Sequence, residues 1–313
     1  MRKEKVLVLM GGMSTEREVS LRSGQAVLEA LLALDYEARA IDYNRSAIKE
    51  IIDYNPDMVF IALHGKYGED GAVQGLLESM QIPYTGSGIA TSAICMDKIL
   101  SKRIFSSEGI PSAPYKVIGA NELAEPEELV NRLKTEVGLP LVIKAATQGS
   151  SIGTYIIRNE KDILPAVKAA FKYSRGALAE KFIDGQEITA AVIGNNEPQV
   201  MPLIEITSSN EFYDYESKYT EGMCQHIIPA QIAEETQAEI IRICQRVYTL
   251  MGCRGFARVD FMLDRSGQPY VLEVNTIPGM TAMSLVPDAA KAANINFPAL
   301  VDIIVKLALE NQS

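Results

Sequence analysis

Two neighbouring segments near the C-terminal end carry polar side chains at a spacing that suits metal binding. The segments FARVDFML and PYVLEVNT alternate as the two strands of a hairpin do, so residues two apart share one face. The polar residues on that face are Arg258, Asp260, Glu273 and Asn275. Their oxygen atoms suit Mg²⁺, which completes its octahedral shell with phosphate oxygens and water. The alternative is a solvent-facing strand surface with an Arg–Asp pair, which the pattern alone does not exclude.

The loop AATQGSSIGT follows an apolar strand that ends at Lys144, and its composition suits anion binding. Gly149 and Gly153 can adopt backbone conformations closed to other residues. Backbone amides in such a loop form an anion cradle, and Lys144 adds a positive charge. Neither the Walker pattern GxxxxGK[ST] nor the dinucleotide pattern GxGxxG is present. A plain Gly/Ser hairpin loop is the alternative.

The segment EKFIDGQE brings charged residues to a strand end and the turn after it. Glu180 could accept hydrogen bonds from an exocyclic amine, and Glu187 could bind a ribose hydroxyl. Lys181 stands beside Glu180 at the same strand end. Charged residues at strand ends are more often simply solvated, so this segment is uninformative by itself.

His64 and Glu16 are candidates near the N-terminal end. His64 opens the glycine-rich segment HGKYGEDGAVQG, where an imidazole at a strand end could meet a carboxylate. A buried structural histidine with satisfied hydrogen bonds is the alternative. Glu16, in GGMSTEREVS, could bind an ammonium group or could cap the first helical turn after Ser14.

The first hundred residues alternate strand and helix patterns, which predicts a parallel sheet with right-handed crossovers. The expected strands and helices cover residues 6–10, 16–33, 38–41, 47–54 and 58–63, and a further helix begins near Gly71. In such a sheet ligands collect at the carboxyl ends of the strands, where Glu16 and His64 fall. We therefore expect residues 1–96 to form an N-terminal α/β domain with a ligand site.

The rest of the chain predicts two units of mixed α+β structure, residues 97–184 and 185–313. The expected elements are helices at 98–106, 126–136 and 233–251 and strands at 139–145, 154–158, 177–184, 187–193, 256–263 and 269–275. The prolines of IPSAPY predict a linker. The tyrosine-rich segment 206–225 is long for a connection and predicts a lid, which spans about 206–228. A mobile surface loop is the alternative.

Composition narrows the function classes. The chain has 313 residues, is 47% hydrophobic and carries a net charge of −10. This negative charge disfavours a nucleic-acid partner, because binding a nucleic-acid backbone needs an extended basic surface to neutralise its phosphates. The four cysteines, Cys95, Cys224, Cys244 and Cys253, form no CxxC pair and predict a reducing compartment. The apolar run 6–10 is too short for a signal sequence or a membrane span. We therefore expect a cytoplasmic protein without a membrane partner.

In their order and spacing, these motifs resemble one family, the D-alanine–D-alanine ligases of the ATP-grasp superfamily. The resemblance runs from Gly11 to Pro287 and rests on GGMSTEREVS, HGKYGEDGAVQG, MDK, KAATQGSSIG, EKFIDGQE, YDYESKYT, GFARVDF and LEVNTIPGMT. It implies an α/β and α+β architecture, an ATP-grasp fold with an N-terminal parallel α/β (pre-ATP-grasp) domain. It also implies ATP-dependent joining of two D-alanines through an acyl phosphate, with release of ADP and phosphate, for peptidoglycan precursor synthesis.

The resemblance also implies a role for particular residues of this chain in binding ATP and metal. The residues implied to contact ATP are Lys98, Lys144, Ser151, Glu180, Lys181, Ile183, Glu187, Phe212, Lys218 and Leu272. Lys98 and Lys144 would neutralise phosphates. Asp260, Glu273 and Asn275 would hold two Mg²⁺ or Mn²⁺ ions.

The implied amino-acid sites involve a further set of residues. In the N-terminal domain, Glu16 would bind the ammonium group of the first D-alanine, and His64 would lie near its carboxylate. Ser284 and the Leu285 amide would bind the carboxylate of the second D-alanine. The implied catalytic residues are Glu16, Ser150, Arg258 and Tyr219, with Lys218 and the Gly279 amide beside them. Tyr219 would connect to Glu16 through Ser150, and Arg258 with Gly279 would stabilise the tetrahedral species.

Two departures from the family pattern border the implied substrate sites. Residues 145–148 read AATQ where the family usually has a proline and a larger polar residue, and Ala282 and Met283 replace the usual Ser-His. A ligase that joins D-alanine to another D-amino acid such as D-serine, or another dipeptide ligase, therefore stays an alternative. Tyr219 favours an amine over D-lactate as acceptor. A non-catalytic nucleotide-binding protein is disfavoured by the intact lysine and metal-ligand set. The resemblance further implies a homodimer.

Overall fold

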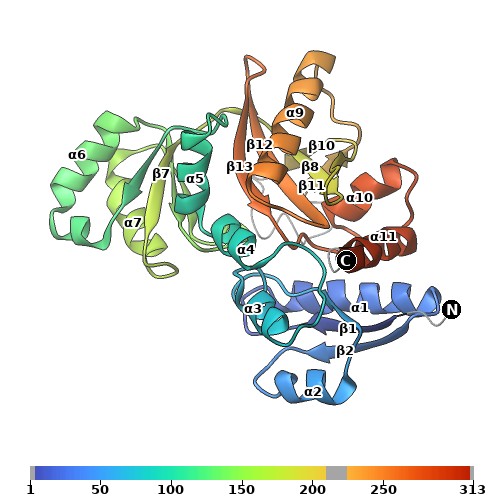
Figure 1. Cartoon of the computed structure of the whole chain (residues 1–313). Coiled ribbons are helices and arrows are strands. Elements are labelled where there is room, and N and C mark those ends of the chain that lie inside the picture. Colours follow the sequence, from blue (N-terminus) through green and yellow to red (C-terminus); the bar gives the residue numbers. More distant parts are fainter. Residues whose placement is uncertain (1–3, 209–223, 311–313) are drawn as a thin grey trace.

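The computed structural model describes residues 4–208 and 224–310 (Figure 1). Its N-terminal unit, residues 4–79, is built on a parallel sheet. Its strands are β1 (Lys5–Met10), β2 (Glu37–Asp42) and β3 (Met58–Ile61), in the order β2-β1-β3. Its helices are α1 (Arg17–Ala33), α2 (Ala47–Tyr54) and α3 (Ala72–Ser79). The continuous apolar run of β1 is needed because both faces of the strand are covered, and residues 6–9 are fully buried. The predicted parallel sheet is confirmed.

Two helices, α4 (Ile89–Met96) and α5 (Lys98–Ser107), lead to the central unit, residues 115–181. Its sheet has the order β4-β7-β5-β6, and every neighbouring pair is antiparallel. The strands are β4 (Tyr115–Ile118), β5 (Leu141–Ala145), β6 (Thr154–Ile157) and β7 (Ala177–Lys181), and the helices are η1 (Ala120–Ala124), α6 (Pro126–Glu136), η2 (Glu160–Asp162) and α7 (Ile163–Ala170). Figure 1 shows this unit projecting to one side, away from both chain ends.

The C-terminal unit, residues 185–310, is built on an antiparallel sheet of order β11-β10-β8-β12-β13, with β9 paired to β8. The strands are β8 (Gly185–Ile193), β9 (Gln199–Val200), β10 (Ile204–Ser208), β11 (Cys224–Ile227), β12 (Phe256–Asp264) and β13 (Pro269–Asn275). The helices are α9 (Glu234–Leu250), α10 (Leu285–Ala292) and α11 (Phe297–Glu310). One parallel and two antiparallel sheets confirm the expected mixture of α/β and α+β structure.

The apolar cores show which units are packed together. One core joins Val6 and Val27 of the N-terminal unit to Phe256 and Leu300 of the C-terminal unit. Helix α11 packs against α1, and the Tyr36 hydroxyl donates a hydrogen bond to Asp302 at 2.6 Å. The central unit has a core of its own, which includes Leu129, Leu133, Leu141, Ile143 and Val167. The N- and C-terminal units therefore form one packed body, and the central unit is attached to it.

The segment 206–225 differs from its prediction as a long loop. Its two ends are strands, because β10 and β11 pair antiparallel with Ile206 opposite His226. The alternation of apolar Ile204 and Ile206 with polar Glu205 and Thr207 is a strand pattern, and both isoleucines are buried. A lid could therefore span only a shorter stretch than 206–228. Residues 209–223 lie outside the described residues.

No single helix in residues 4–208 and 224–310 is long and apolar enough to cross a membrane. The pair α10 and α11, which is bent by 104°, passes such a test jointly by length and composition alone.

Candidate active site

The face predicted on the β12–β13 hairpin is present. Arg258 lies opposite Asn275, and Asp260 lies opposite Glu273 in the strand register. The Arg258 guanidinium donates to both oxygens of Asp260, at 2.8 and 2.7 Å. Asn275 Nδ2 and Thr189 Oγ1 also donate to this carboxylate, at 3.0 and 2.6 Å. The Arg–Asp pair of the alternative reading therefore exists, but Asp260 is only 5% exposed and is not part of a solvent-facing surface.

A first cavity lies between the central and C-terminal sheets and encloses about 840 Å³, its open mouth included. It is lined by the predicted nucleotide residues Lys98, Lys144, Ser151, Glu180, Lys181, Ile183, Glu187 and Leu272. Asp260 and Glu273 form part of the same wall. Apolar side chains such as Val142, Ile156 and Met262 line the remainder, which gives the mixed surface typical of a small-molecule site.

Two lysines and one glutamate form a buried charge cluster at the wall of the first cavity. Glu180 lies 2.9 Å from Lys144 Nζ and 3.3 Å from Lys102 Nζ. Burial favours a raised pKa for the Glu180 carboxyl, but Lys102 and Lys144 outweigh burial and lower that pKa. Burial lowers the pKa of Lys102, whereas at Lys144 the carboxylate of Glu180 outweighs burial and raises the pKa. A cationic side chain is therefore maintained beside the cavity.

Lys98 connects the glycine loop to the polar face of the β12–β13 hairpin. It is the first residue of α5, whose N-cap Asp97 accepts hydrogen bonds from the amides of Ile99 and Leu100 at 2.9 and 3.1 Å. Lys98 Nζ donates to the Gln148 carbonyl at 2.7 Å and lies 3.1 Å from Glu273 Oε2. The cap therefore fixes the start of the helix from which Lys98 reaches the first cavity.

The glycine loop joins the first cavity to a second one. Ser150 and Ser151 have φ angles of 48° and 60°, in the left-handed backbone region that residues other than glycine seldom adopt. This turn directs the two serines to opposite cavities, because Ser151 lines the first and Ser150 the second. The Ser150 hydroxyl donates a hydrogen bond to Glu16 Oε1. Glu16 makes no side-chain cap on α1, so the capping alternative for this residue is wrong.

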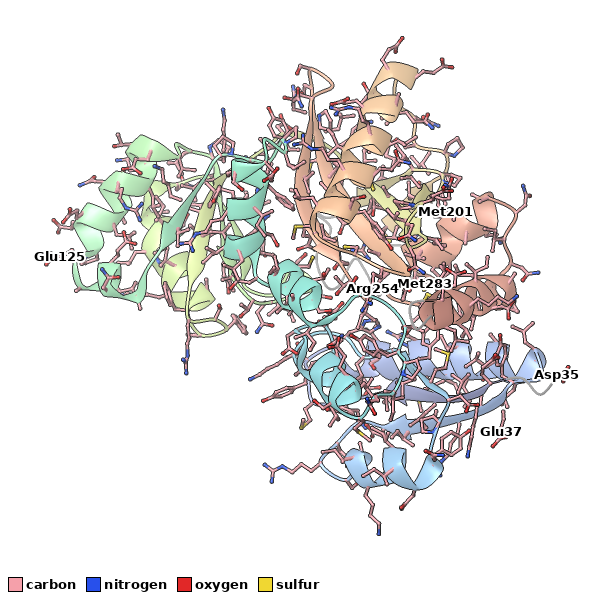
Figure 2. All side chains as sticks on the ribbon, in the orientation of Figure 1. Asp35, Glu37, Glu125, Met201, Arg254 and Met283 are labelled. Atoms are coloured by element: carbon pink, nitrogen blue, oxygen red, sulfur yellow. The ribbon has the colours of Figure 1, made fainter. Side chains whose placement is uncertain are left out.

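The second cavity encloses about 620 Å³ and is lined by the described residues that were predicted to bind the amino-acid substrates. Its lining includes Glu16, His64, Ser150, Arg258, Asn275, Gly279, Ser284 and Leu285. Glu273 lines both cavities, which are therefore adjacent. Figure 2 labels Met283, another lining residue, near the junction of the N- and C-terminal units, whereas Glu125 lies at the outer edge of the central unit.

His64 is a buried histidine with partners at both ring nitrogens, as the structural alternative expects, and it also lines the second cavity. Its Nδ1 lies 3.1 Å from the Ile277 carbonyl and its Nε2 lies 3.2 Å from Ser23 Oγ. Burial lowers its pKa, an effect that the nearby Glu16 carboxylate opposes. The side chain is 5% exposed and still lines the second cavity. A fixed, neutral imidazole is the resulting state near pH 7.

Two charged residues in or beside the site, Glu69 and Lys102, were missed by the sequence prediction. Glu69 lines the second cavity and accepts a hydrogen bond from the Gly65 amide at 2.7 Å. Burial, followed by the charge of Glu16, raises the Glu69 pKa. Lys102 follows Lys98 by four residues and pairs with Glu180. The spacing of the two lysines on one helix face was a usable signal for Lys102, whereas Glu69 in a GED turn resembles any surface glutamate.

Three predicted residues cannot be assigned to either cavity. Phe212, Lys218 and Tyr219 lie outside the described residues. The metal prediction concerns residues that are described. Within residues 4–208 and 224–310, no group of three His, Cys, Asp or Glu residues is close enough to hold a metal by itself. Two carboxylates and an amide oxygen on one face nevertheless fit Mg²⁺, which in nucleotide sites takes its other oxygens from phosphate and water.

Comparison with known proteins agrees with this geometry. The family profile described as D-ala D-ala ligase C-terminus matches residues 104–306, and the N-terminus profile matches residues 44–87. Proteins named D-alanine–D-alanine ligase from Moorella thermoacetica and Pelotomaculum thermopropionicum are 52% and 50% identical to the chain. These alignments cover 98% of this chain, and 99% and 97% of the respective relatives.

Solved structures extend the likeness to the fold. The D-alanine–D-alanine ligase of Coxiella burnetii matches with a TM-score of 0.85 at 28% identity, over 99% of this chain and 95% of the other. The Bacillus anthracis ligase complexed with ATP matches with a TM-score of 0.82 at 32% identity, over 98% of both chains. Its sequence, its ATP-grasp fold and its two adjoining cavities together make this chain a member of the D-alanine–D-alanine ligase family.

Proposed function

We propose that the protein joins two molecules of D-alanine into D-alanyl-D-alanine at the expense of ATP, for peptidoglycan precursor synthesis. The observation that carries this proposal is the position of Glu273, which lines both cavities. A nucleotide in the first cavity and an amino acid in the second would have their reacting ends on either side of this residue. The family relatives described above support the same assignment of substrates.

In the first cavity we assign the triphosphate to the lysine side and the nucleoside to the strand end. Lys98 and Lys144 provide the positive charge for the phosphate oxygens. Glu180, Lys181 and Glu187 supply polar contacts for base and ribose, and Ile183 and Leu272 supply apolar contacts. The apolar wall contributed by Val142 and Ile156 supports the same orientation.

Asp260, Glu273 and Asn275 are the proposed ligands of two Mg²⁺ or Mn²⁺ ions. When bound, such ions offset the charge that spreads over the transferring phosphoryl oxygens. The protein's own part is to keep this face ordered. Arg258 donates to both oxygens of Asp260 and Thr189 donates to one of them, which holds the carboxylate in place at the cavity wall.

In the second cavity we assign the ammonium group of the first D-alanine to Glu16. Ser150, which donates to Glu16, orients that carboxylate. His64 lines the same cavity as Glu16, which supports a place near the substrate carboxylate. Ser284 and the Leu285 amide, at the first turn of α10, are assigned to the second carboxylate, because helix N-termini favour anions.

The proposed reaction follows from the chemistry of the substrates. A carboxylate does not react with an amine at neutral pH, because its leaving group is oxide. Transfer of the γ-phosphoryl group to the first D-alanine makes an acyl phosphate, from which phosphate can leave. The amine of the second D-alanine then attacks the acyl carbon, and Arg258 with the Gly279 amide stabilises the negative oxygen of the tetrahedral species. Exclusion of water protects the acyl phosphate from hydrolysis.

The test is mass analysis of the product formed from ATP and a panel of D- and L-amino acids. We expect D-alanyl-D-alanine with one ADP and one phosphate per peptide bond. The panel includes D-serine, because Met283 lines the second cavity where the family usually has a different residue. Preferential formation of a D-alanyl-D-serine product, or ATP hydrolysis without any peptide, would contradict the proposal.

Three further parts of the proposal rest on the sequence patterns and the family resemblance. We place the first-substrate site in residues 1–96 and divide the nucleotide site between residues 97–184 and 185–313. Lys218 and Tyr219 are assigned to a lid within residues 209–223, with Tyr219 completing the contact from Ser150 to Glu16, and Phe212 to the nucleotide. A cytoplasmic location and a homodimer are also proposed, and light scattering of the purified protein tests the homodimer.

A further inference from the structure

Outside both cavities, a cysteine and a histidine of strand β11 and an aspartate of helix α10 lie next to one another in a row. Cys224 and His226 are two residues apart on β11, so they share one face of that strand. His226 faces the first turn of α10, where Asp288 lies. Cys224 Sγ is 4.0 Å from His226 Nε2, and His226 Nδ1 is 2.6 Å from Asp288 Oδ2. None of these three residues lines the first or second cavity.

The short contact to Asp288 determines how the imidazole is protonated. An ionised carboxylate can only accept, so the hydrogen between His226 and Asp288 must be on Nδ1. The neutral ring then presents a lone pair at Nε2, on the side of the Cys224 sulfur. Asp288 also stabilises the imidazolium that forms when Nε2 accepts a proton. This is the arrangement by which a histidine activates a thiol and an acid orients the histidine.

The cluster is accessible from solvent. Cys224 is half-buried, and the His226 and Asp288 side chains are 13% and 29% exposed. Cys224 packs in part against the core shared by the N- and C-terminal units, and the remainder of its surface is exposed. The other three cysteines, Cys95, Cys244 and Cys253, are all buried. Cys224 is therefore the least buried of the four cysteines.

We propose that Cys224 is an activated thiol and a site of covalent modification by small disulfides. His226 Nε2 accepts the thiol proton, and the Cys224 sulfur attacks one sulfur of the disulfide. A new S–S bond forms, the old one breaks, and the second sulfur departs as a thiolate with the electron pair. Cys224 is thereby oxidised and the departing sulfur reduced, so the step needs no other oxidant. Asp288, which pairs with His226, stands one helical turn from Ser284 of the second cavity, because Asp288 N donates to the Ser284 carbonyl.

The test uses the full-length protein and dithiobis-nitrobenzoate, a disulfide that releases a coloured thiolate as it reacts. We expect one fast equivalent of thiolate per chain, at a rate about tenfold or more above that of glutathione at the same pH. Peptide mass analysis should find the adduct on Cys224. A rate no faster than glutathione, or an adduct on a different cysteine, would overturn the proposal without any variant being needed.

Variants separate activation from mere exposure. His226→Gln should slow the fast phase about tenfold or more, Asp288→Asn should slow it less, and Cys224→Ser should abolish it. Cys253→Ser is the matched control and should leave the fast phase unchanged, since Cys253 is buried. Thermal unfolding of each variant checks that the fold is retained. An unchanged rate in folded His226→Gln shows that the thiol reacts through exposure alone and ends the proposal.

Discussion

At the scale of single residues, Glu273 is the carboxylate that lines both cavities. Its carboxylate lies 3.1 Å from Lys98 and stands opposite Asp260 on the hairpin. Glu273→Ala removes a proposed metal ligand and leaves Lys98 without this partner. We expect magnesium-dependent ADP formation to fall by about a thousandfold or more, equivalent to ~4 kcal/mol of transition-state stabilisation.

The matched control for Glu273→Ala is Glu160→Ala. Glu160 makes an exposed ion pair with Lys134 at 2.5 Å, and such surface pairs contribute about 0–1 kcal/mol. Its replacement should leave ADP formation within about twofold of the unmodified protein. Near-normal turnover in Glu273→Ala would remove the metal assignment.

The buried charges around Glu180 make a prediction about pH. Lys102 and Lys144 lower the Glu180 pKa below its ordinary value of 4.5. A carboxyl whose pKa is lower in the folded than in the unfolded chain binds its proton more readily when unfolded, so its stabilisation is present above pH 4.5 and is lost as pH falls through the folded pKa. Glu180→Gln should therefore show a shallower loss of melting temperature between about pH 5 and pH 3. An equally steep acid limb would contradict this.

The residue scale is also where sequence reasoning reached furthest. Of the predicted ATP and substrate residues, those that are described line the two cavities. Motif spacing is informative there because chemistry constrains residue type. Glu69 was missed since its importance arises only from burial beside Glu16, and the turn that carries it has no chemical signature of its own.

At the scale of elements, the start of α5 couples helix stability to the site. The Asp97 carboxylate accepts from the amides of Ile99 and Leu100, and Lys98 is the first helical residue. Asp97→Ala should cost about 1 kcal/mol of unfolding free energy in urea denaturation. It should also raise the KM for ATP, because the first turn of α5, which carries Lys98, is no longer held by its cap. Asp97→Asn retains a capping oxygen and should recover most of the stability; equal losses in both variants would argue against the cap.

Local patterns predicted many elements because periodicity and breakers are local signals. The helices α2 and α6 and the strand β13 were predicted within their observed bounds. The strands β10 and β11 were assigned to a loop, since five alternating residues are a weak signal beside a long polar stretch. The packing of α11 on α1 could not be read from either helix, because it joins segments at opposite ends of the chain.

At the scale of the whole molecule, separate cores predict separate opening of the units. Leu133 belongs to the core confined to the central unit, whereas Leu300 belongs to the core shared by the other two. Leu133→Ala should destabilise by about 3 kcal/mol and should speed amide hydrogen exchange mainly in residues 115–181. Leu300→Ala, the matched control, should speed exchange in residues 4–62 and 285–310 together. Uniform acceleration across the chain in both variants would contradict independent cores.

The shared core also constrains the order in which the protein matures on the ribosome. Val27 and Leu31 of α1 are covered in part by residues from the last described helix. While translation is still in progress, this apolar side of the first helix has no native neighbour to meet. This apolar side of the nascent N-terminal unit therefore stays exposed until residues 297–310 emerge, and chaperones have this surface to shield during that interval.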